Sequence, residues 1–277
     1  MIRPYDTQLL STVYHLLTTV LRSPMPNLRF ILDTKRPGAL NMGIDEAVLE
    51  GVIAETSPAT LRFYGWEPDC LTIGYFQSLR EEADLAKCQE LGVDCIRRAT
   101  GGGAVLHQYE LTYSLIAPVG HYGIPEAILD SYRHICDGII QSLKLMDVQA
   151  DFVPLNDIIA NGKKISGNAQ TRRHGVVLQH GTILLDVDLE KMFSLLLIPD
   201  EKIKDKMIAG AKERVTGLKS ILGREVGFAE LAEHLQAGFA QVLQTELAPG
   251  QIGPHELNRA KRFAAEKYGA DSWNFKR

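Results

Sequence analysis

The sequence is poor in cysteine and carries no large excess of either charge. Its cysteines form no CxxC pair and have no histidines at metal-ligand spacing, which excludes a zinc site and a disulfide framework and indicates a reducing, cytoplasmic location. The formal net charge is -4 and the pI is about 6.1, so no overall field attracts nucleic acid or an anionic membrane. We therefore expect no nucleic-acid partner and no membrane partner. The four cysteines are Cys70, Cys88, Cys95 and Cys136.

Several motifs of nucleotide-binding and hydrolytic enzymes are also missing. The sequence has no GxxxxGK[ST] loop and no GxSxG elbow. A run of three glycines is present, but a strand-like segment follows it, whereas a dinucleotide fingerprint requires a helix there. The sequence therefore gives no support to Walker-type, Rossmann-type or α/β-hydrolase chemistry.

Residues 1–26 contain apolar residues at helical spacing but no uninterrupted apolar run. Ser11 and His15 interrupt the pattern, no basic cluster precedes it, and no small-residue cleavage site follows. We expect an N-terminal helical extension that ends at Pro24 and Pro26, and neither a signal peptide nor a membrane span.

The rest of the chain has a globular pattern. With 277 residues and 45% hydrophobic content, it can bury one large core and a smaller one. Short β-like runs alternate with helical ones, which predicts an α+β fold. Asn41, Asp45 and Glu46 suit the N-terminus of the first of these helices. We place a catalytic domain over 27–216 and a small helical domain over 217–277. The expected strands are 28–32, 61–66, 70–77, 93–98, 104–107, 111–116 and 176–185, and the expected helices are 41–54, 125–146, 228–247 and 255–268.

The densest group of candidate site residues is the run Arg97-Arg98-Ala99-Thr100-Gly101-Gly102-Gly103-Ala104-Val105-Leu106-His107. Consecutive glycines let the backbone come close to a ligand and direct several N–H groups at it, and a guanidinium matches carboxylate or phosphate oxygens. This run therefore predicts a cradle for such an anion. The alternative is a glycine-rich hairpin turn whose arginines face water.

A second candidate is Lys164, which follows the hairpin signal Asn161-Gly162 and precedes the small-residue segment Ser166-Gly167-Asn168-Ala169. A backbone of small residues can approach a ligand, so the Lys164 ammonium could enter a pocket and stabilise developing negative charge. The alternative is that Lys163 and Lys164 flank a hairpin in solvent.

Four further polar residues are candidates on chemical grounds. His107 and His180 lie at strand ends, where an imidazole donates to an acyl carbonyl, shuttles a proton or serves as a structural residue. Asn156 and Asp157 precede the lysine segment and could orient it or hold Mg²⁺, although an Asn-Asp pair is equally typical of a turn. The lysine-rich stretch 202–212 is most simply a solvated helix face.

The ordered set of these motifs resembles the lipoate-protein ligase and octanoyltransferase family. The set comprises the glycine run, Thr112-Tyr113-Ser114, Asn156-Asp157, Lys164-Ile165-Ser166-Gly167-Asn168-Ala169 and Gln179-His180-Gly181-Thr182, and the resemblance extends from about Leu28 to Arg277. It implies the fold that this family shares with biotin-protein ligases, a mixed β-sheet flanked by helices with an apolar tunnel for the acyl chain. It also implies a small, mainly helical C-terminal accessory domain and a catalytic role for Lys164.

On the ligase branch, the resemblance implies ATP and Mg²⁺ as cofactors and lipoate as substrate. The lipoate carboxylate attacks the α-phosphate of ATP, and a lysine of a lipoyl-domain acceptor, of the H-protein or dehydrogenase acyltransferase type, then attacks the lipoyl-adenylate. Lys164 would stabilise charge at both steps. The acyl-binding residues implied are Arg98, Gly103, His107, Lys164 and His180. The nucleotide-binding residues implied are Arg97, Thr100, Gly101, Gly102, Gly103, Asn156, Asp157, Lys164, Gly167 and Ala169, with Asp157 also as the Mg²⁺ ligand.

The choice between the branches depends on a cysteine. The runs Phe63-Tyr64-Gly65-Trp66, Glu110-Leu111-Thr112-Tyr113-Ser114 and Trp273-Asn274 resemble the octanoyltransferase or amidotransferase branch, whose nucleophilic cysteine lies between the long helix and the lysine motif. Residues 147–162 occupy that place here and contain no cysteine, and the three-glycine loop is intact where that branch can carry an arginine. We therefore expect an ATP-dependent ligase that activates lipoate or octanoate.

Two alternatives to this expectation remain open. One is an octanoyltransferase that moves octanoyl from a carrier protein to a lipoyl domain, with the same lysine polarising the thioester carbonyl. The other is a non-catalytic module that binds lipoyl domains, which predicts damage at Lys164 or in the glycine run, and the sequence shows none.

Overall fold

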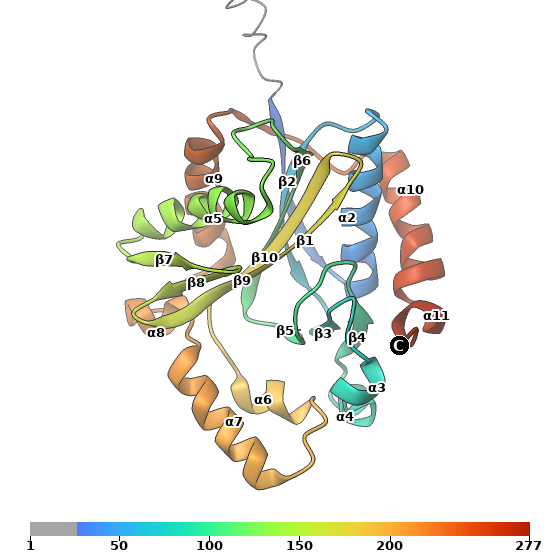
Figure 1. The fold of residues 1–277 in the computed structure, drawn as a ribbon, viewed down its shortest axis with the longest axis vertical. Helices are drawn as coiled ribbons and strands as arrows, with labels where there is room; N and C mark the ends of the chain where they lie inside the picture. The colour runs from blue at the N-terminus through green and yellow to red at the C-terminus, as the bar shows by residue number, and fades with distance from the viewer. Residues whose placement is uncertain (1–26) are drawn as a thin grey trace, which may run out of the picture.

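The computed structural model describes residues 27–277, so the helix expected within 1–26 lies outside the described residues. The centre of the fold is an eight-stranded mixed sheet with the order β11-β1-β2-β6-β10-β9-β8-β7 (Figure 1). β11, β1 and β2 run parallel to one another, whereas the other neighbouring strands are antiparallel. A second sheet has the order β4-β3-β5. The strands are β1 (Leu28–Arg36), β2 (Thr60–Trp66), β3 (Cys70–Ile73), β4 (Asp94–Arg97), β5 (Val105–His107), β6 (Glu110–Pro118), β7 (Ala150–Val153), β8 (Asp157–Ala160), β9 (Lys163–Arg173), β10 (Val176–Leu184) and β11 (Leu247–Pro249).

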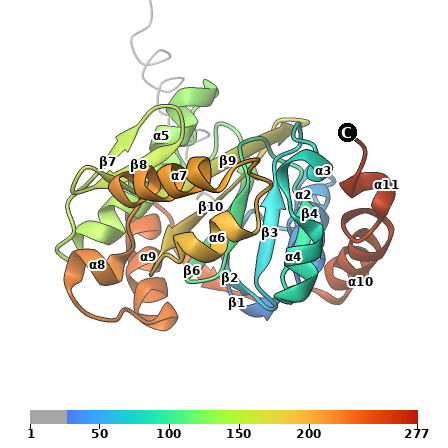
Figure 2. The ribbon, with the colours of Figure 1, turned by 90° about the horizontal axis from the view of Figure 1, so that it is seen from below.

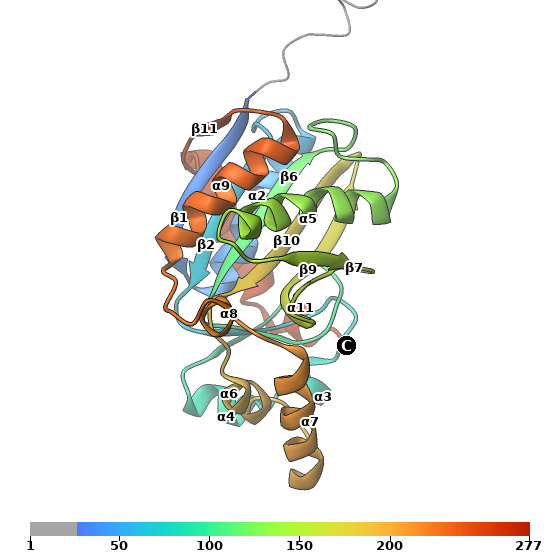
Figure 3. The same cartoon turned by 90° about the vertical axis from the view of Figure 1, so that its left-hand side faces the viewer.

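Helices cover both faces of the large sheet, which confirms the predicted α+β class. α5 and α9 pack on one face, and α2 and α10 pack on the other (Figure 1, Figure 3). Among the described residues, no helix is long and apolar enough to cross a membrane. The helices are α2 (Gly38–Ile53), α3 (Leu79–Glu82), α4 (Leu85–Glu90), α5 (Ile128–Lys144), α6 (Leu189–Ser194), α7 (Glu201–Arg214), α8 (Leu218–Leu222), α9 (Phe228–Leu243), α10 (Pro254–Phe263), a π-helical turn (Ala264–Tyr268) and α11 (Asp271–Asn274).

The main core lies between the sheet and the α5/α9 pair. The side chains of Ile135, Ile139 and Leu143 recur at helical spacing along α5 and are fully buried, which contributes roughly 1.5–3 kcal/mol for each. The two helices approach closely at Gly238, where a Cβ atom would lie 2.1 Å from Ser142 Oγ. The structure thus places α9 and β11 against the same sheet as the preceding residues, and the domain boundary near residue 216 stays a prediction.

The start of α2 differs from the prediction. The helix begins at Gly38, directly after Pro37, and not at Asn41. Asn41, Asp45 and Glu46 therefore lie inside the helix and are buried, so their expected role at the helix N-terminus is wrong. These polar side chains are tolerated there because each has partners on neighbouring elements, as described below for Asp45.

The lower end of the sheet holds the elements that surround the candidate site. The Asn161-Gly162 hairpin is confirmed, since both residues have positive φ, 51° and 74°, and join β8 to β9. The lysine-rich stretch 202–212 lies in α7, where only Ile208 is buried, which confirms an exposed helix. Seen from below, α6 and α7 lie between the β7–β8 pair and the small sheet (Figure 2).

Candidate active site

A cavity of about 370 Å³ opens where the glycine loop, residues 98–104, meets the ends of β9 and β10 and the helices α6 and α7. One part of its wall is apolar, and another carries polar side chains and the glycine backbone. The apolar residues include Met42, Trp66, Leu184, Leu189, Met192, Phe193, Ala211 and Val215. The predicted site residues that line it are Arg98, Gly101, Gly102, Gly103, His107, Asn156, Lys164, Gly167, Ala169 and His180. The fold thus brings together candidates from four separate segments of the chain.

The side chain of Arg98 bonds to the backbone of the glycine loop and holds the shape of the loop. Its guanidinium donates to the carbonyl oxygens of Gly101 at 2.7 Å and Gly103 at 2.8 Å, and to Thr72 Oγ1 at 3.1 Å. Burial lowers its pKa to about 10. Gly102 needs its lack of a side chain, because its φ is +99° and a Cβ there would lie 2.7 Å from Arg98 Nη2. A turn whose arginines face water is therefore wrong for this run.

Arg97 and Thr100 do not line the cavity. The Arg97 side chain is fully buried, and its guanidinium donates to backbone carbonyls, among them those of Tyr75 and Asn274. Thr100 Oγ1 lies 2.7 Å from His180 Nε2. Both residues thus contact segments that pack against the glycine loop. Their predicted nucleotide contacts stay predictions.

Lys164 lies on β9 with its ammonium 2.7 Å from Asp157 Oδ1 and its side chain about 39% exposed. The side chain crosses over Gly167, where a Cβ atom would lie 2.9 Å from both Lys164 Cε and Nζ. Lys163 differs from its neighbour, since its ammonium donates to the Lys212 carbonyl and the residue does not line the cavity. The two lysines therefore have separate environments, and Lys164 faces the cavity.

Paired amides join the turn at residues 154–156, between β7 and β8, to β9. Asn168 Nδ2 donates to the Asn156 carbonyl at 2.9 Å, and the Asn156 amide donates in return to the Asn168 carbonyl. Asn168 Oδ1 accepts from Tyr113 Oη at 2.7 Å. Asp157 pairs with Lys164 and does not itself line the cavity. Within residues 27–277, no group of three or more His, Cys, Asp or Glu side chains is placed to hold a metal ion.

His107 is enclosed by protein groups on both ring nitrogens. Nδ1 lies 2.6 Å from Glu110 Oε1, and Nε2 lies 2.9 Å from Thr72 Oγ1. The ring stacks on Trp66 with centroids 4.0 Å apart. Glu110 was not among the predicted site residues, although its place three residues after His107, at the start of a buried strand, is a signal that could have identified it. A buried carboxylate needs a partner, and a nearby imidazole supplies one.

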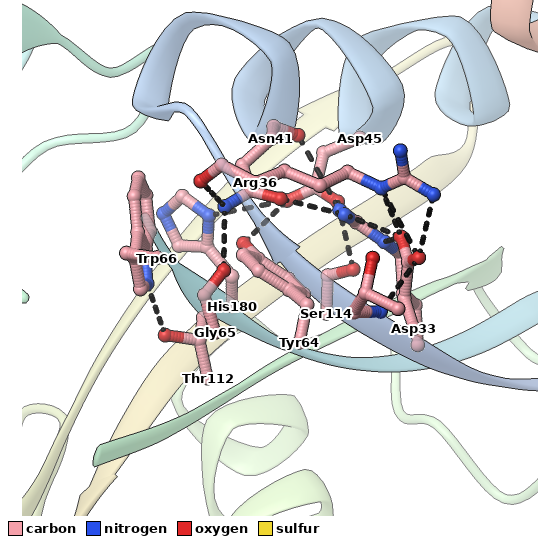
Figure 4. Close-up of polar contacts among 12 residues, drawn as sticks. Asp33, Arg36, Asn41, Asp45, Tyr64, Gly65, Trp66, Thr112, Ser114 and His180 are labelled. Atoms are coloured by element: carbon pink, nitrogen blue, oxygen red, sulfur yellow. Dashed lines mark hydrogen bonds and ion pairs between the residues drawn. The ribbon is translucent and has the colours of Figure 1, made fainter. Parts of the chain in front are cut away.

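His180 connects the cavity to a buried polar network around Asp45 (Figure 4). Asp45 Oδ2 lies 3.7 Å from His180 Nδ1, and Asp45 Oδ1 accepts from Arg62 Nη1 and Ser114 Oγ, each at 2.9 Å. Burial lowers the pKa of His180 despite the Asp45 charge. For Asp45, burial alone would raise the pKa, but the neighbouring His180 and Arg62 side chains lower it. An arginine between the apolar residues Leu61 and Phe63 is the sequence signal for this network, and it was missed.

The cysteines of the described chain are enclosed by other residues to different degrees. Cys70, Cys88 and Cys136 are buried and Cys95 is partly buried, and none of them lines the cavity. Burial raises the pKa of the Cys136 thiol, which disfavours the thiolate that a nucleophile requires. The β7–β8 hairpin fills the interval 150–160, where the resemblance implies a cysteine-bearing loop. Within residues 27–277, the cavity therefore presents no thiol.

Comparison with known proteins agrees with this architecture. The sequence model described as "Lipoyl protein ligase A/B catalytic domain" matches residues 37–240. The octanoyltransferase LipM of Brevibacillus brevis is 35% identical over 91% of this chain and 100% of its own length, and that of Geobacillus kaustophilus is 37% identical over 90% and 98%. A bi-partite lipoate protein ligase of Thermoplasma acidophilum, studied with its E2 lipoyl domain, superposes with a TM-score of 0.81 at 29% identity and covers 90% of this chain and 96% of its own. A lipoate-protein ligase A bound with ATP has a TM-score of 0.76 at 27% identity, over 90% and 98%.

The comparisons correct one prediction. The expected ATP-dependent ligase is wrong, because these full-length relatives are named octanoyltransferases. The error came from the absent cysteine. Losing one nucleophile removes a thioester intermediate but creates no need for ATP, and the same lysine and loop can serve either reaction. By its description, one structural neighbour binds ATP, but that ligand is a property of the neighbour. By its sequence and its fold, this chain belongs to the lipoyl protein ligase A/B catalytic domain family.

Proposed function

We propose that this protein is an octanoyltransferase that moves an octanoyl group from the thioester of a carrier protein to a lysine of a lipoyl-domain acceptor. The transfer is direct, without an acyl-enzyme on cysteine and without ATP. The observation that carries the proposal is the placement of Lys164 and the glycine loop on one cavity that no described thiol lines. The names of the full-length relatives support the octanoyl substrate.

The size and lining of the cavity suit a single short acyl chain. Its volume of about 370 Å³ is at the lower end of the range of small-ligand sites, roughly 300–1,000 Å³. Met192, Phe193 and Leu184 supply apolar surface, and Lys164 and Gly102 supply polar groups. An octanoyl chain would bury its methylenes against the apolar residues and place its carbonyl near the Lys164 ammonium and the Gly102 backbone.

The chemistry needs no activation by a nucleotide, because a thioester is already activated. The acceptor amine, after losing the ammonium proton, attacks the carbonyl carbon, so that a C–N bond forms. The C–S bond then breaks, the nitrogen gives up its second proton, and the sulfur takes up that proton and leaves as a thiol. Lys164 would donate to the carbonyl oxygen as it gains negative charge, and the backbone N–H groups of the glycine loop would add to this stabilisation. Asp157 Oδ1, 2.7 Å from the ammonium, would keep the Lys164 side chain in place by ion pairing.

The first test is mass spectrometry of a lipoyl domain incubated with the protein and either octanoyl-carrier protein without ATP or free octanoate with Mg-ATP. We expect an octanoyl mass gain from the thioester alone, loss of that gain in Lys164→Ala, and near-normal transfer in Lys163→Ala. The Lys163 variant is the matched control, since its ammonium bonds to the Lys212 carbonyl outside the cavity. A product formed only with free acid and ATP would overturn the proposal.

A second test examines the absence of a thiol intermediate. Direct transfer requires both substrates to be bound together, so initial rates should follow a sequential pattern, and no acyl-enzyme should accumulate when the acceptor is omitted. Cys95→Ala removes the most exposed of the four thiols and should retain full turnover. Ping-pong kinetics with a trapped octanoyl-cysteine would contradict the direct mechanism.

The proposal includes a cytoplasmic location, which the cysteine usage of the sequence predicts. Lipoyl-domain acceptors in the cytoplasm would be accessible to the enzyme there.

A further inference from the structure

The C-terminal segment 271–277 is bonded to the strand that leads into the glycine loop. Arg97, the last residue of β4, and Asn274, the last residue of α11, are 177 positions apart in sequence. The Arg97 backbone N–H donates to Asn274 Oδ1 at 2.8 Å, and Arg97 Nη2 donates to the Asn274 carbonyl at 2.8 Å. Trp273 Nε1 donates to the Arg97 carbonyl at 2.8 Å, and Arg97 Nε donates to the Trp273 carbonyl at 3.0 Å. Both backbone groups of Arg97 are thus bonded by side chains of α11.

The same guanidinium also reaches the turn that supports the glycine loop from the other side. Arg97 Nη1 donates to the carbonyl oxygens of Gly74 at 3.2 Å and Tyr75 at 2.9 Å. This turn contacts the loop directly, since the Tyr75 N–H donates to the Thr100 carbonyl at 2.8 Å. A Cβ atom on Gly74 would lie 2.0 Å from the Gly102 carbonyl oxygen. Arg97 therefore joins three segments, α11, the 74–77 turn and the base of the glycine loop.

The physical state of Arg97 makes this junction rigid. The residue is fully buried, and every hydrogen bond of its guanidinium within the described residues goes to a backbone carbonyl. A buried cation without a carboxylate depends on complete hydrogen bonding, so the loss of its α11 partners forces it and the adjoining backbone to shift. Arg98 follows directly and holds the carbonyls of Gly101 and Gly103, so a shift at Arg97 is passed to the loop.

We infer that Trp273 and Asn274 are positioning residues for the glycine loop, and this inference rests on the proposed acyl transfer. Neither residue lines the cavity, so neither contacts substrate. Trp273 also packs its ring against Tyr75, with centroids 5.8 Å apart, which fixes α11 against the supporting turn. The C-terminal segment thereby sets the geometry in which the loop N–H groups meet the acyl carbonyl.

The test compares octanoyl transfer by Asn274→Ala, Asn274→Asp, Trp273→Phe and Asp271→Ala in the full chain. Asn274→Ala removes the acceptor of the Arg97 N–H, whereas Asn274→Asp retains it. Trp273→Phe keeps an aromatic ring in place of the indole but removes the Nε1 donor. Asp271 is exposed on the same short helix and is the matched control. We expect Asn274→Ala and Trp273→Phe to lose about tenfold or more in kcat with little change in KM, because the apolar wall that holds the chain is untouched. Asn274→Asp should recover part of the loss, and Asp271→Ala should match the wild type.

A loss of stability must be separated from a loss of positioning. Ile139→Val, a core substitution on α5, lowers the melting temperature without touching the loop and provides the comparison. The inference would be overturned if Asn274→Ala had the wild-type kcat. It would also be overturned if Asn274→Ala lost no more kcat than an Ile139→Val protein of equal melting temperature.

A readout without substrate keeps this inference separate from the proposed function. Hydrogen exchange of the peptide 98–104 should be faster in Asn274→Ala than in Asp271→Ala, whatever reaction the enzyme performs. If the wild type transfers nothing from a thioester, the proposed function fails, and the exchange result alone decides whether α11 orders the loop. Equal exchange in the two variants would overturn the positioning role.

Discussion

A Gly167→Ala substitution should displace the Lys164 ammonium while leaving the fold intact. The added Cβ would lie 2.9 Å from both Cε and Nζ of Lys164, and no backbone atom is among its close neighbours. Ordinary contact requires about 3.5–4.0 Å, so the end of the lysine must move by about 1 Å. A displacement of that size at a reacting group costs about a hundredfold in rate. Lys164 can move this far because its side chain is about 39% exposed.

The stability of the variant should change in the opposite direction. Gly167 does not have the positive φ that disfavours other residues, so alanine fits the strand without strain. Replacing glycine by alanine at a compatible position stabilises a protein by about 0.4–1 kcal/mol, because the unfolded chain loses conformational freedom. The prediction is therefore a loss in kcat/KM of about a hundredfold, with a melting temperature equal to or above that of the wild type.

The control for this experiment is Gly65→Ala on β2. Its Cβ would also meet a lysine side chain at 2.9 Å, that of Lys35, but this lysine does not line the cavity. Octanoyl transfer to a lipoyl domain and thermal unfolding should be measured for both variants. If Gly167→Ala keeps a third or more of wild-type kcat/KM, the reasoning is refuted. A double variant with Lys164→Ala should show no further loss from Gly167→Ala, since the second change acts only through the lysine.

Two other perturbations test the loop and the buried histidine. Gly102→Ala should reduce transfer and cost about 1–2 kcal/mol of unfolding free energy, because its φ of +99° disfavours a side chain, whereas Gly101→Ala should leave the unfolding free energy nearly unchanged, since nothing lies within 4 Å of its added Cβ. Urea unfolding and kcat/KM of the two variants check this, and equal behaviour would contradict it. Burial lowers the pKa of His180 below its ordinary 6.5, so the neutral form favours the folded state. Stability should therefore be fully present above pH 6.5 and should fall as the pH drops toward the folded-state pKa. Melting temperatures from pH 7.5 to about 5 should show this slope in the wild type and a flatter one in His180→Asn, and parallel slopes would refute the assignment.

The local features of this protein were accessible from the sequence. Asn161-Gly162 predicts its own hairpin, because both residues tolerate positive φ. The apolar spacing along 125–146 predicts a helix, and α5 occupies Ile128–Lys144 within it. The choice of Lys164 over Lys163 came from its place in the family's motif, and the structure shows Lys164 on the cavity wall. The hairpin and the helix depend on neighbours in the chain, and short-range backbone preferences are sufficient for them, whereas the choice of Lys164 rested on the family resemblance.

The directions of buried polar side chains were not accessible. Asp45 fits the start of a helix by its type, yet it lies inside α2 and pairs with Arg62 on β2. The sequence predicts an anion contact for both arginines of the glycine run but not their protein partners, which are α11 for Arg97 and the loop that contains it for Arg98. The partners of such groups come from elements distant in sequence, and residue type alone does not select among them.

The sequence by itself determined the α+β class, the hairpin before the lysine, and the residue types of the candidate site. Only the tertiary structure decided which of those residues share the cavity, which hold the loop from behind, and how α11 reaches β4. The physical reason is that secondary structure follows from periodicity and turn chemistry within a few residues, whereas a site depends on where buried charges and hydrogen-bond donors find partners across the fold.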